Sequence, residues 1–361
     1  MKVLKNLDFK IFGESHGDMI GFVLSGFPSG IRINEELIKI ELMKRRPQGK
    51  ISTPRVELDE YKFISGVFNG YTTGENITVV ITNNNKKSSD YNNYIPRPSH
   101  SDLAANLKTN GFNDYRGGGA FSGRLTAPLV IMGALAKTIL NEKNIKIISQ
   151  IKQIGIHTDD EMNFTKEEIE KLESDKFPCL NNNVKEEMIK LVESIMSADS
   201  VGGMIKTYVL NVPKGLGGSY FNGVESILSF LIYGIPAVKS VSFGDGIEFS
   251  SSFGSMVLDE MCFTNGNINY LANHNGGILG GITTGEPIII NSVIKPTPTI
   301  TKTVKTINLK TKENIEYSFS GRHDPCIVPR AYVPIESVVS IALLDLLLSE
   351  FGYKYFKENC E

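Results

Sequence analysis

Two apolar stretches, PLVIMGALAKTIL (residues 128–140) and SIALLDLLL (residues 340–348), decide the fold of this chain. Both are too short to span a bilayer and each contains a charged residue, so we expect two buried core helices. A helix that is apolar nearly all round needs cover on both sides, and a sheet on either side would provide it. We therefore predict an α+β fold, a layered β-α-β sandwich in which central apolar helices pack between antiparallel sheets.

Other segments supply further elements for these layers. Asn34 followed by two glutamates is a good helix start, and Pro47 stops this helix after Arg45 and Arg46. No linker or repeat divides the chain, so we expect one domain over residues 1–361, with a polar surface excursion at 158–190. Apolar spacing predicts helices at about 124–142, 184–197, 222–234 and 335–351, and strands at 77–82, 145–156, 204–212 and 287–294.

The composition excludes several classes of protein. With 22% charged and 41% hydrophobic residues and a net charge of −2, the chain has no field strong enough for nonspecific nucleic-acid binding. The opening residues contain no apolar run fit for a signal peptide, and we expect no membrane partner. Four scattered cysteines without a CxxC pair argue against a disulfide framework or a zinc site. We expect a cytoplasmic protein without a metal.

Three short segments place a histidine beside a serine or an aspartate: GESHG (13–17), RPSHSD (97–102) and GRHDPC (321–326). Their glycines and prolines are typical of loops. Histidine can donate or accept a proton near neutral pH, so this arrangement favours an acid–base enzyme. His157, in an apolar strand pattern, is more simply a structural histidine.

Ser15 and His16 allow more than one interpretation. A hydrolase of the Ser-His-Asp type is disfavoured, because adjacent loop residues rarely hydrogen-bond as nucleophile and base and no GxSxG segment is present. Proton transfer from His16 to a leaving group is the sharper functional alternative. A structural role for this segment is equally open from the residues alone.

Arginine is rare in this chain and concentrated in the motif loops. The chain has nine Arg among 38 basic residues, and Arg97, Arg124 and Arg322 all lie in Gly- or Pro-rich segments. A guanidinium binds a carboxylate or phosphate in two-point fashion, which Lys cannot reproduce. We therefore predict an anionic ligand for these three, whereas surface ion pairs explain Arg32 and Arg55 equally well.

A glycine-rich segment, DYRGGGAFSGRLT (114–126), leads into the first apolar helix. Glycine-rich loops at helix starts bind phosphates through backbone N–H groups. The spacing matches neither GxGxxG nor GxxxxGK[ST]. The segments NHNGGILGGITTGEP (273–287) and KPTPT (295–299) are either turns between strands or a close-contact surface for a flat cofactor with a phosphate tail.

The ordered set GESHG, RPSHSD, RGGG…SGR, HNGGILGGI, KPT and GRHDPC resembles the chorismate synthase family over about residues 7–348. Further agreement comes from ADSVGG (198–203), VPKGLG (212–217) and AVKSVSFGDG (237–246). The resemblance implies a carbon–oxygen lyase of the shikimate pathway, which leads to the aromatic amino acids. Its reaction would be the anti-1,4-elimination of phosphate from 5-enolpyruvylshikimate 3-phosphate, giving chorismate, with reduced FMN required.

The resemblance also implies roles for individual residues. His16 matches the histidine that protonates the phosphate leaving group, and His100 matches the one that stabilises the charge of the reduced flavin. Asp324, working with Ser15, matches the aspartate that accepts a proton relayed from flavin N5. The implied substrate-binding residues are Arg45, Arg46, Lys50, Arg97, Arg124 and Arg322. The implied flavin-binding residues are Ala120, Phe121, Ser122, Pro236, Ala237, Gly280, Lys295, Pro296, Thr297, Pro298, Thr299 and Arg322.

The chain departs from the family pattern at three places. Ala120-Phe121-Ser122 stands where many members have Arg-Ser-Ser, and Pro236-Ala237 stands where others have Asn-Ala. Lys50 occupies a position where a second anion-binding arginine is common. These departures leave the acid–base residues in place and affect the expected flavin contacts.

The expected partners follow from the same resemblance. The family is typically homotetrameric, and reduction of the flavin would come from an external reductase, with NADPH as the alternative if the enzyme reduces its own flavin. Two rival functions remain from the residues. One is a flavin-independent phosphate-handling lyase, and the other is a noncatalytic protein that binds an anionic ligand.

Overall fold

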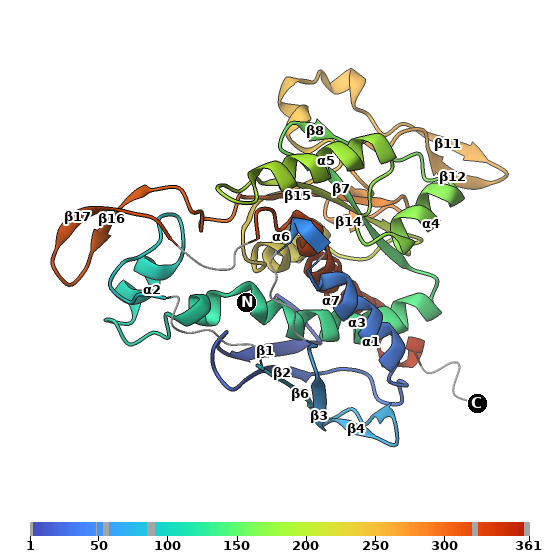
Figure 1. The fold of residues 1–361 in the computed structure, drawn as a ribbon. Helices are drawn as coiled ribbons and strands as arrows, with labels where there is room; N and C mark the ends of the chain where they lie inside the picture. Colours follow the sequence, from blue (N-terminus) through green and yellow to red (C-terminus); the bar gives the residue numbers. More distant parts are fainter. Residues whose placement is uncertain (1–2, 48, 53–57, 85–90, 320–323, 357–361) are drawn as a thin grey trace.

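The structure, a computed structural model, describes residues 3–47, 49–52, 58–84, 91–319 and 324–356. Two antiparallel sheets lie on either side of a layer of central helices (Figure 1). The predicted α+β sandwich is therefore confirmed. The central helices are α1 (Glu35–Arg45), α3 (Thr126–Glu142) and α7 (Val328–Phe351).

The first sheet has four strands in the order β1-β2-β6-β3. Burial alternates along β6, so that Ile77, Val79 and Ile81 are buried against the helices. Helix α3 contacts this sheet through β2 and β6. The strands are β1 (Asp8–Gly13), β2 (Met19–Ser25), β6 (Ile77–Thr82) and β3 (Tyr61–Ser65).

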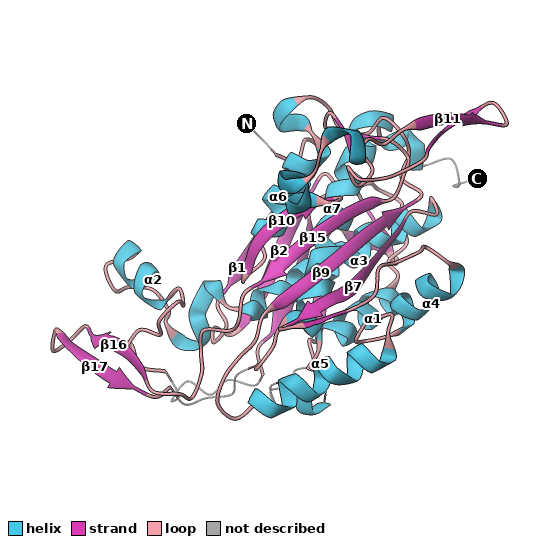
Figure 2. Cartoon of the chain, turned by 90° about the horizontal axis from the view of Figure 1, so that it is seen from above, coloured by secondary structure: helices cyan, strands magenta, loops and turns pink. Residues whose placement is uncertain are grey.

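The second sheet has five strands in the order β10-β15-β9-β7-β8, and α7 packs on β7 and β9. Its outer face is covered by α4 (Lys166–Ser174) and α5 (Asn182–Ile195), so the polar excursion at 158–190 forms an outer layer (Figures 1 and 2). The strands are β10 (Val238–Phe243), β15 (Ile288–Ile294), β9 (Gly203–Leu210), β7 (Lys146–Ile154) and β8 (His157–Thr158).

The two apolar stretches form the predicted core helices. Within the described ranges, the segments Arg116–Glu142 and Val328–Phe351 are long and apolar enough to cross a membrane, and their apolar windows are 83% and 100% buried inside the protein. Helix α7 begins seven residues before the predicted residue 335. Pro329 lies in its first turn, where a missing N–H is tolerated, and Pro334 lies inside the helix.

A buried ionic cluster joins the three central helices. Nζ of Lys137 in α3 donates to Glu41 of α1 at 2.7 Å and to Glu336 of α7 at 2.6 Å. All three side chains are less than 10% exposed. Burial penalises the Glu41 carboxylate, but the Lys137 charge outweighs this and lowers the pKa of Glu41 from 4.5 to about 2.

The remaining elements extend from this body. Helix α6 (Val224–Tyr233) packs on α7 and β10, and α2 (Asp102–Lys108) lies near the hairpin β16–β17 (Figure 1). Figure 2 shows β11–β12 and β16–β17 projecting from the molecule on different sides. The hairpins are β4–β5 (Val67–Phe68, Tyr71–Thr72), β11–β12 (Met261–Thr264, Asn267–Tyr270), β13–β14 (Ile278–Leu279, Ile282–Thr283) and β16–β17 (Val304–Asn308, Glu313–Tyr317).

Candidate active site

A cavity of about 660 Å³ lies where the end of α1, the start of α7 and several loops meet. Its volume falls within the range of roughly 300–1,000 Å³ that is usual for small-molecule sites. Segments that are far apart in the sequence therefore converge on one place. The lining residues come from 45–47, 97–101, 117–126, 233–239, 295–299 and 324–334, together with Asp59 and Tyr91.

The triglycine segment 117–119 brings two of the three motif histidines, His16 and His100, to one wall of this cavity. All three glycines have positive φ, a conformation that residues with a side chain rarely adopt. A Cβ atom on Gly117 would lie 2.5 Å from Cδ2 of His16, and one on Gly118 would lie 3.3 Å from Cε1 of His100. The glycines thus allow two imidazole rings to approach the backbone closely.

This segment does not form the phosphate-binding helix start that its composition predicts. Three consecutive left-handed residues cannot continue into an α-helix, and α3 begins only at Thr126. The segment forms a turn of its own, and Ser15 N donates to Gly119 O at 3.1 Å. The loop that carries His16 is therefore fixed to the glycines by a backbone hydrogen bond.

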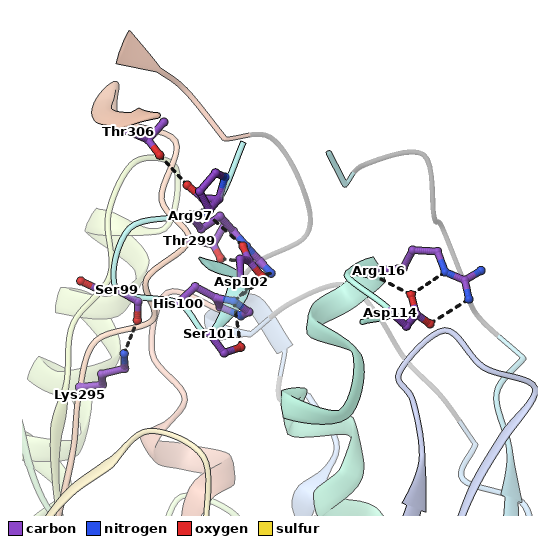
Figure 3. Close-up of polar contacts among 11 residues, drawn as sticks. Arg97, Ser99, His100, Ser101, Asp102, Asp114, Arg116, Lys295, Thr299 and Thr306 are labelled. Atoms are coloured by element: carbon purple, nitrogen blue, oxygen red, sulfur yellow. Dashed lines mark hydrogen bonds and ion pairs between the residues drawn. The ribbon is translucent and has the colours of Figure 1, made fainter. Parts of the chain in front are cut away.

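His100 belongs to a network of charged side chains (Figure 3). Its Nδ1 lies 2.7 Å from Asp102 Oδ1, while Arg97 donates to the same carboxylate through Nε at 2.7 Å and through a terminal nitrogen at 2.9 Å. Burial disfavours the Asp102 carboxylate, but hydrogen bonds from Arg97 and His100 outweigh it and hold the pKa of Asp102 below its usual range. Nδ1 of His100 therefore faces Asp102 and Arg97, and Nε2 lies near Gly118.

The KPTPT segment is bound to the loop that carries His100. Arg97 donates to Thr299 Oγ1 at 3.2 Å, and Lys295 Nζ donates to the Ser99 carbonyl at 2.6 Å (Figure 3). Burial, together with the nearby charge of Lys239, lowers the pKa of Lys295. Two ammonium groups therefore share this side of the cavity, which favours an anion there.

His16 is buried, with 4% of its surface exposed, and its ring meets Tyr91 edge-on at a centroid distance of 5.3 Å. Ser15 Oγ beside it is fully buried and has no hydrogen-bond partner among the described residues. An unsatisfied buried hydroxyl is costly, so it indicates a place where a ligand atom can bind. Asp114 and Arg116 form a further ion pair near this loop (Figure 3).

Asp59 holds two of the predicted anion-binding arginines. Arg45 donates to Asp59 Oδ2 at 2.9 Å, and Arg124 bonds the other carboxylate oxygen. The Asp59 side chain is fully buried, and its φ of 53° is unusual for a residue with a side chain. Burial would raise its pKa, but the charges of Arg45 and Arg124 lower it. Within the described residues, Nε of Arg45 and Nε of Arg46 are buried without a partner.

Asp324 is held at the start of α7. Arg330 donates to Asp324 Oδ2 at 2.5 Å, and the Asp324 carbonyl accepts from Thr297 Oγ1 at 2.7 Å. Both the backbone and the side chain of Asp324 are thus fixed by neighbours, and 12% of the side chain is exposed to the cavity region.

The structure brings most of the sequence-predicted residues together. Ser15 and His16 lie behind Gly117, at the cavity wall. The other predicted residues that line the cavity are Arg45, Arg46, Arg97, His100, Ala120, Phe121, Ser122, Arg124, Pro236, Ala237, Lys295, Thr297, Pro298, Thr299 and Asp324.

Four of the predicted residues lie elsewhere or cannot be placed. Gly280 lies in the turn of β13–β14, outside the cavity lining, and Pro296 is not among the lining residues either. Arg322 and the side chain of Lys50 lie outside the described residues. His274 binds Asp245 at 2.7 Å, also outside the lining.

The sequence interpretation missed several lining residues, among them the charged or aromatic Asp59, Tyr91, Tyr233, Lys239 and Arg330. Arg330 carried a usable signal, because it lies in the same segment as GRHDPC in a chain with few arginines. Asp59 carried no usable signal, because one acidic residue among others in an acidic segment resembles a solvated surface residue.

The chemistry of the cavity fits a flat, anionic ligand. Its lining combines an apolar wall that includes Phe121, Ile235 and Pro236 with many cations. This charge contrasts with the net −2 of the chain. A flavin fits this donor set, since a ring system can lie on the apolar wall and a phosphate can meet the lysines. The charged lining residues are Arg45, Arg46, Arg97, Arg124, Lys239, Lys295 and Arg330 against Asp59 and Asp324.

Comparison with known proteins agrees with this site. The family model for chorismate synthase matches residues 7–348. The chain belongs to the chorismate synthase family. A chorismate synthase of Thermococcus gammatolerans is 41% identical over 348 residues, covering 95% of this chain and 96% of that protein. One from Methanocaldococcus jannaschii is 42% identical over 354 residues, covering 94% and 93%.

A solved structure supports the same conclusion. A crystal structure of chorismate synthase aligns with a TM-score of 0.75 and 29% identity, covering 97% of this chain and 94% of that one. The chain is therefore a lyase with chorismate synthase function, from a family that requires reduced flavin. The flavin-independent lyase and the noncatalytic binder are not favoured.

Proposed function

We propose that the cavity binds 5-enolpyruvylshikimate 3-phosphate beside reduced FMN and releases chorismate and inorganic phosphate by anti-1,4-elimination. The observation that carries this proposal is the convergence of His16 and His100 on consecutive glycines at the wall of a strongly cationic cavity. The reaction breaks the bond between a ring carbon and the phosphate oxygen and removes one ring hydrogen. Acid–base groups and anion-binding groups are therefore both required.

Arginines bind the substrate, which carries two carboxylates and a phosphate. Arg45 and Arg124 are held by the buried Asp59, so their orientation is set before the ligand arrives. The unpartnered Nε groups of Arg45 and Arg46 support binding of an anion at this end. Preorganised donors of this kind lose little side-chain entropy on binding. Lys50, Arg97 and Arg322 complete the proposed substrate-binding set.

His16 acts as the general acid and donates a proton to the departing phosphate. Its burial against Tyr91 and the triglycine segment excludes bulk water from the proton that it transfers. His100, held by Asp102 at Nδ1, directs Nε2 toward the cavity wall and stabilises charge there.

Asp324 accepts the proton that corresponds to the ring hydrogen lost by the substrate, with Ser15 assisting. Its oxygen Oδ2 is anchored by Arg330, and the orphan hydroxyl of Ser15 supports a relay that a ligand completes. His16 gives up one proton and Asp324 takes up one, so the protein returns to its starting charge after proton exchange between the two groups.

Residues of the apolar wall and the KPTPT segment hold the flavin. Reduced FMN, when bound, supplies the electron density that the elimination needs. Lys295, Thr297 and Thr299 lie where a phosphate tail could bind, and Phe121 and Pro236 offer flat apolar contacts. The proposed flavin-binding set also contains Ala120, Ser122, Ala237, Pro296, Pro298 and Arg322. Gly280 stays in this set, although it lies outside the cavity lining.

We propose a homotetramer as the assembly. The hairpin β11–β12 supports self-association, because it projects from the body and carries exposed apolar side chains such as Met261 and Phe263, the latter 79% exposed (Figure 2). A two-stranded hairpin is marginally stable alone, and exposed apolar patches mark interaction surfaces. A second copy of this chain would cover it.

An anaerobic assay that follows chorismate formation with chemically reduced FMN tests the reaction. We expect His16→Ala, His100→Ala and Asp324→Asn each to lower turnover by about 10²–10⁴-fold, the usual loss when proton transfer is removed. His157→Ala is the matched control, since this histidine lies on β8 and pairs with Glu187 of α5. A motif variant that turns over as fast as His157→Ala would remove that residue from the mechanism.

The same assay separates the two sources of reduced flavin. With oxidised FMN and NADPH alone, we expect no chorismate, because reduction comes from an external reductase. Product formation under those conditions would assign the reductase activity to this chain.

A further inference from the structure

Arg330 is a half-buried arginine that neither the substrate-binding nor the flavin-binding set contains. It lies in the first turn of α7 and lines the cavity. Burial lowers the pKa of Arg330, and the nearby Asp324 carboxylate only partly offsets this. A guanidinium in such a place is costly unless its hydrogen bonds are well made.

The Arg330 fork makes two contacts with different parts of the site. One terminal nitrogen donates to Asp324 Oδ2 at 2.5 Å, and Nε donates to the backbone carbonyl of Arg45 at 2.9 Å. Arg45 is the last residue of α1, so the fork joins the end of one central helix to the segment that precedes another. A single planar group therefore sets the position of Asp324 relative to Arg45.

The described contacts of Asp324 divide between its main chain and its carboxylate. Thr297 Oγ1 donates to the Asp324 backbone carbonyl. The next residue, Pro325, accepts a backbone hydrogen bond from Val201 N at 2.8 Å. These bonds hold the main chain, whereas Arg330 bonds the carboxylate at Oδ2.

We propose that Arg330 is a positioning residue for this reaction: it orients the Asp324 carboxylate and couples it to the anion-binding end of α1. The inference rests on the proposed role of Asp324 as proton acceptor. Lysine cannot replace Arg330, because one ammonium group lacks the planar fork that reaches both acceptors. Arg330 itself contributes no proton to the reaction.

Arg330→Lys tests this with substrate binding and turnover measured separately. We expect kcat with reduced FMN to fall by about 10²-fold, the cost of roughly 1 Å of misplacement. Calorimetric binding of 5-enolpyruvylshikimate 3-phosphate to the flavin-free protein should change less than threefold. Arg32→Lys, at an exposed position on the first sheet's side of the molecule, is the control and should leave both quantities unchanged.

A double variant shows whether Arg330 acts through Asp324. We expect Arg330→Lys combined with Asp324→Asn to be no slower than Asp324→Asn alone, because residues that act as one unit are non-additive. A wild-type kcat in Arg330→Lys, or additive losses in the double variant, would overturn the inference. If Asp324→Asn alone keeps wild-type turnover, the proposed function of Asp324 fails instead. If Arg330→Lys does not fold, Arg330→Gln is measured against the same double-variant comparison.

Discussion

The space between the triglycine segment and His16 leaves no room for a side chain at residue 117. A Cβ atom there would lie 2.5 Å from the His16 ring and 2.9 Å from Ser15 Oγ. Real Cβ atoms do not approach other atoms this closely, so the ring or the backbone would have to shift. His16, the proposed general acid, can therefore take this position only because residue 117 has no side chain.

We predict that Gly117→Ala lowers turnover by about 10²-fold, because His16 is displaced from the cavity wall. An alanine in this left-handed backbone conformation should also lower the free energy of unfolding by about 1–2 kcal/mol. Gly70→Ala is the matched control, since Gly70 also has positive φ but a Cβ atom there would meet nothing within 4 Å. Equal turnover in the two variants would show that the contact with His16 has no functional weight.

Arginine usage pointed to Arg97 and Arg124, which line the cavity, but it could not predict the partners of the arginines there. Arg97, Arg45 and Arg124 were expected to meet a ligand, yet each is first held by an aspartate of the protein, Asp102 or Asp59. Side-chain pairing across the fold depends on three-dimensional proximity, which leaves no periodic trace in the sequence. The roles of these residues toward a ligand stay predictions.

Elements with strong apolar patterns were predicted closely. The strand expected at residues 77–82 is β6 (Ile77–Thr82), and the helix expected at about 124–142 is α3 (Thr126–Glu142). The start of α7 was missed by seven residues, because Pro334 breaks the local helix pattern while burial on every side keeps the helix intact. Tertiary packing overrides local propensity there.

The ionic cluster between α1, α3 and α7 gives a prediction at the scale of elements. Lys137→Met leaves the buried Glu336 carboxylate without this cation and Glu41 with Lys44 alone, so the free energy of unfolding near pH 7 should fall by about 3–5 kcal/mol. Denaturant unfolding measures this loss. Lys146→Met, which breaks the more exposed pair with Glu173, should cost no more than about 1 kcal/mol.

The pH dependence of the same variant has a definite sign. In the wild type the pKa of Glu41 is lowered from 4.5 to about 2, so its stabilisation is complete above pH 4.5 and lost as the pH falls through 2. Without Lys137, Glu41 keeps only the charge of Lys44 against its burial, and burial is the larger effect and favours the protonated carboxyl. Lys137→Met should therefore gain stability between pH 8 and pH 5. A variant that loses stability over that interval would contradict this account.

At the scale of the whole molecule, the sandwich followed from two apolar helices that need cover on both faces. The projecting hairpin β11–β12 did not follow, because its short strands lie outside any core and their pattern resembles a loop. Gly280 in β13–β14 also lies away from the cavity. Segments that do not pack within one chain cannot be placed from core-forming patterns.

We predict that Phe263→Lys, combined with Met261→Lys, reduces the assembly mass measured by sedimentation, because charged side chains would be buried against a second copy. Both side chains are more than 60% exposed in the single chain, so its folding should be unaffected. Ile156→Lys, at an exposed turn beside β8, is the control. An unchanged mass, or a wild type that sediments as a monomer, would place this surface outside any self-association.

The segment at residues 5–7 is bound to the last long helix. Backbone N–H groups of Lys5, Asn6 and Leu7 donate to the Asp345 carboxylate at 2.7–2.8 Å, across about 340 positions of the chain. Helix α7 also contacts α1, α3, α6 and the five-stranded sheet. During synthesis, residues 5–7 therefore cannot complete their native contacts until α7 has been made. Until then the two sheets lack one of the helices that cover their apolar faces. We therefore expect the nascent chain to need chaperones until α7 is available.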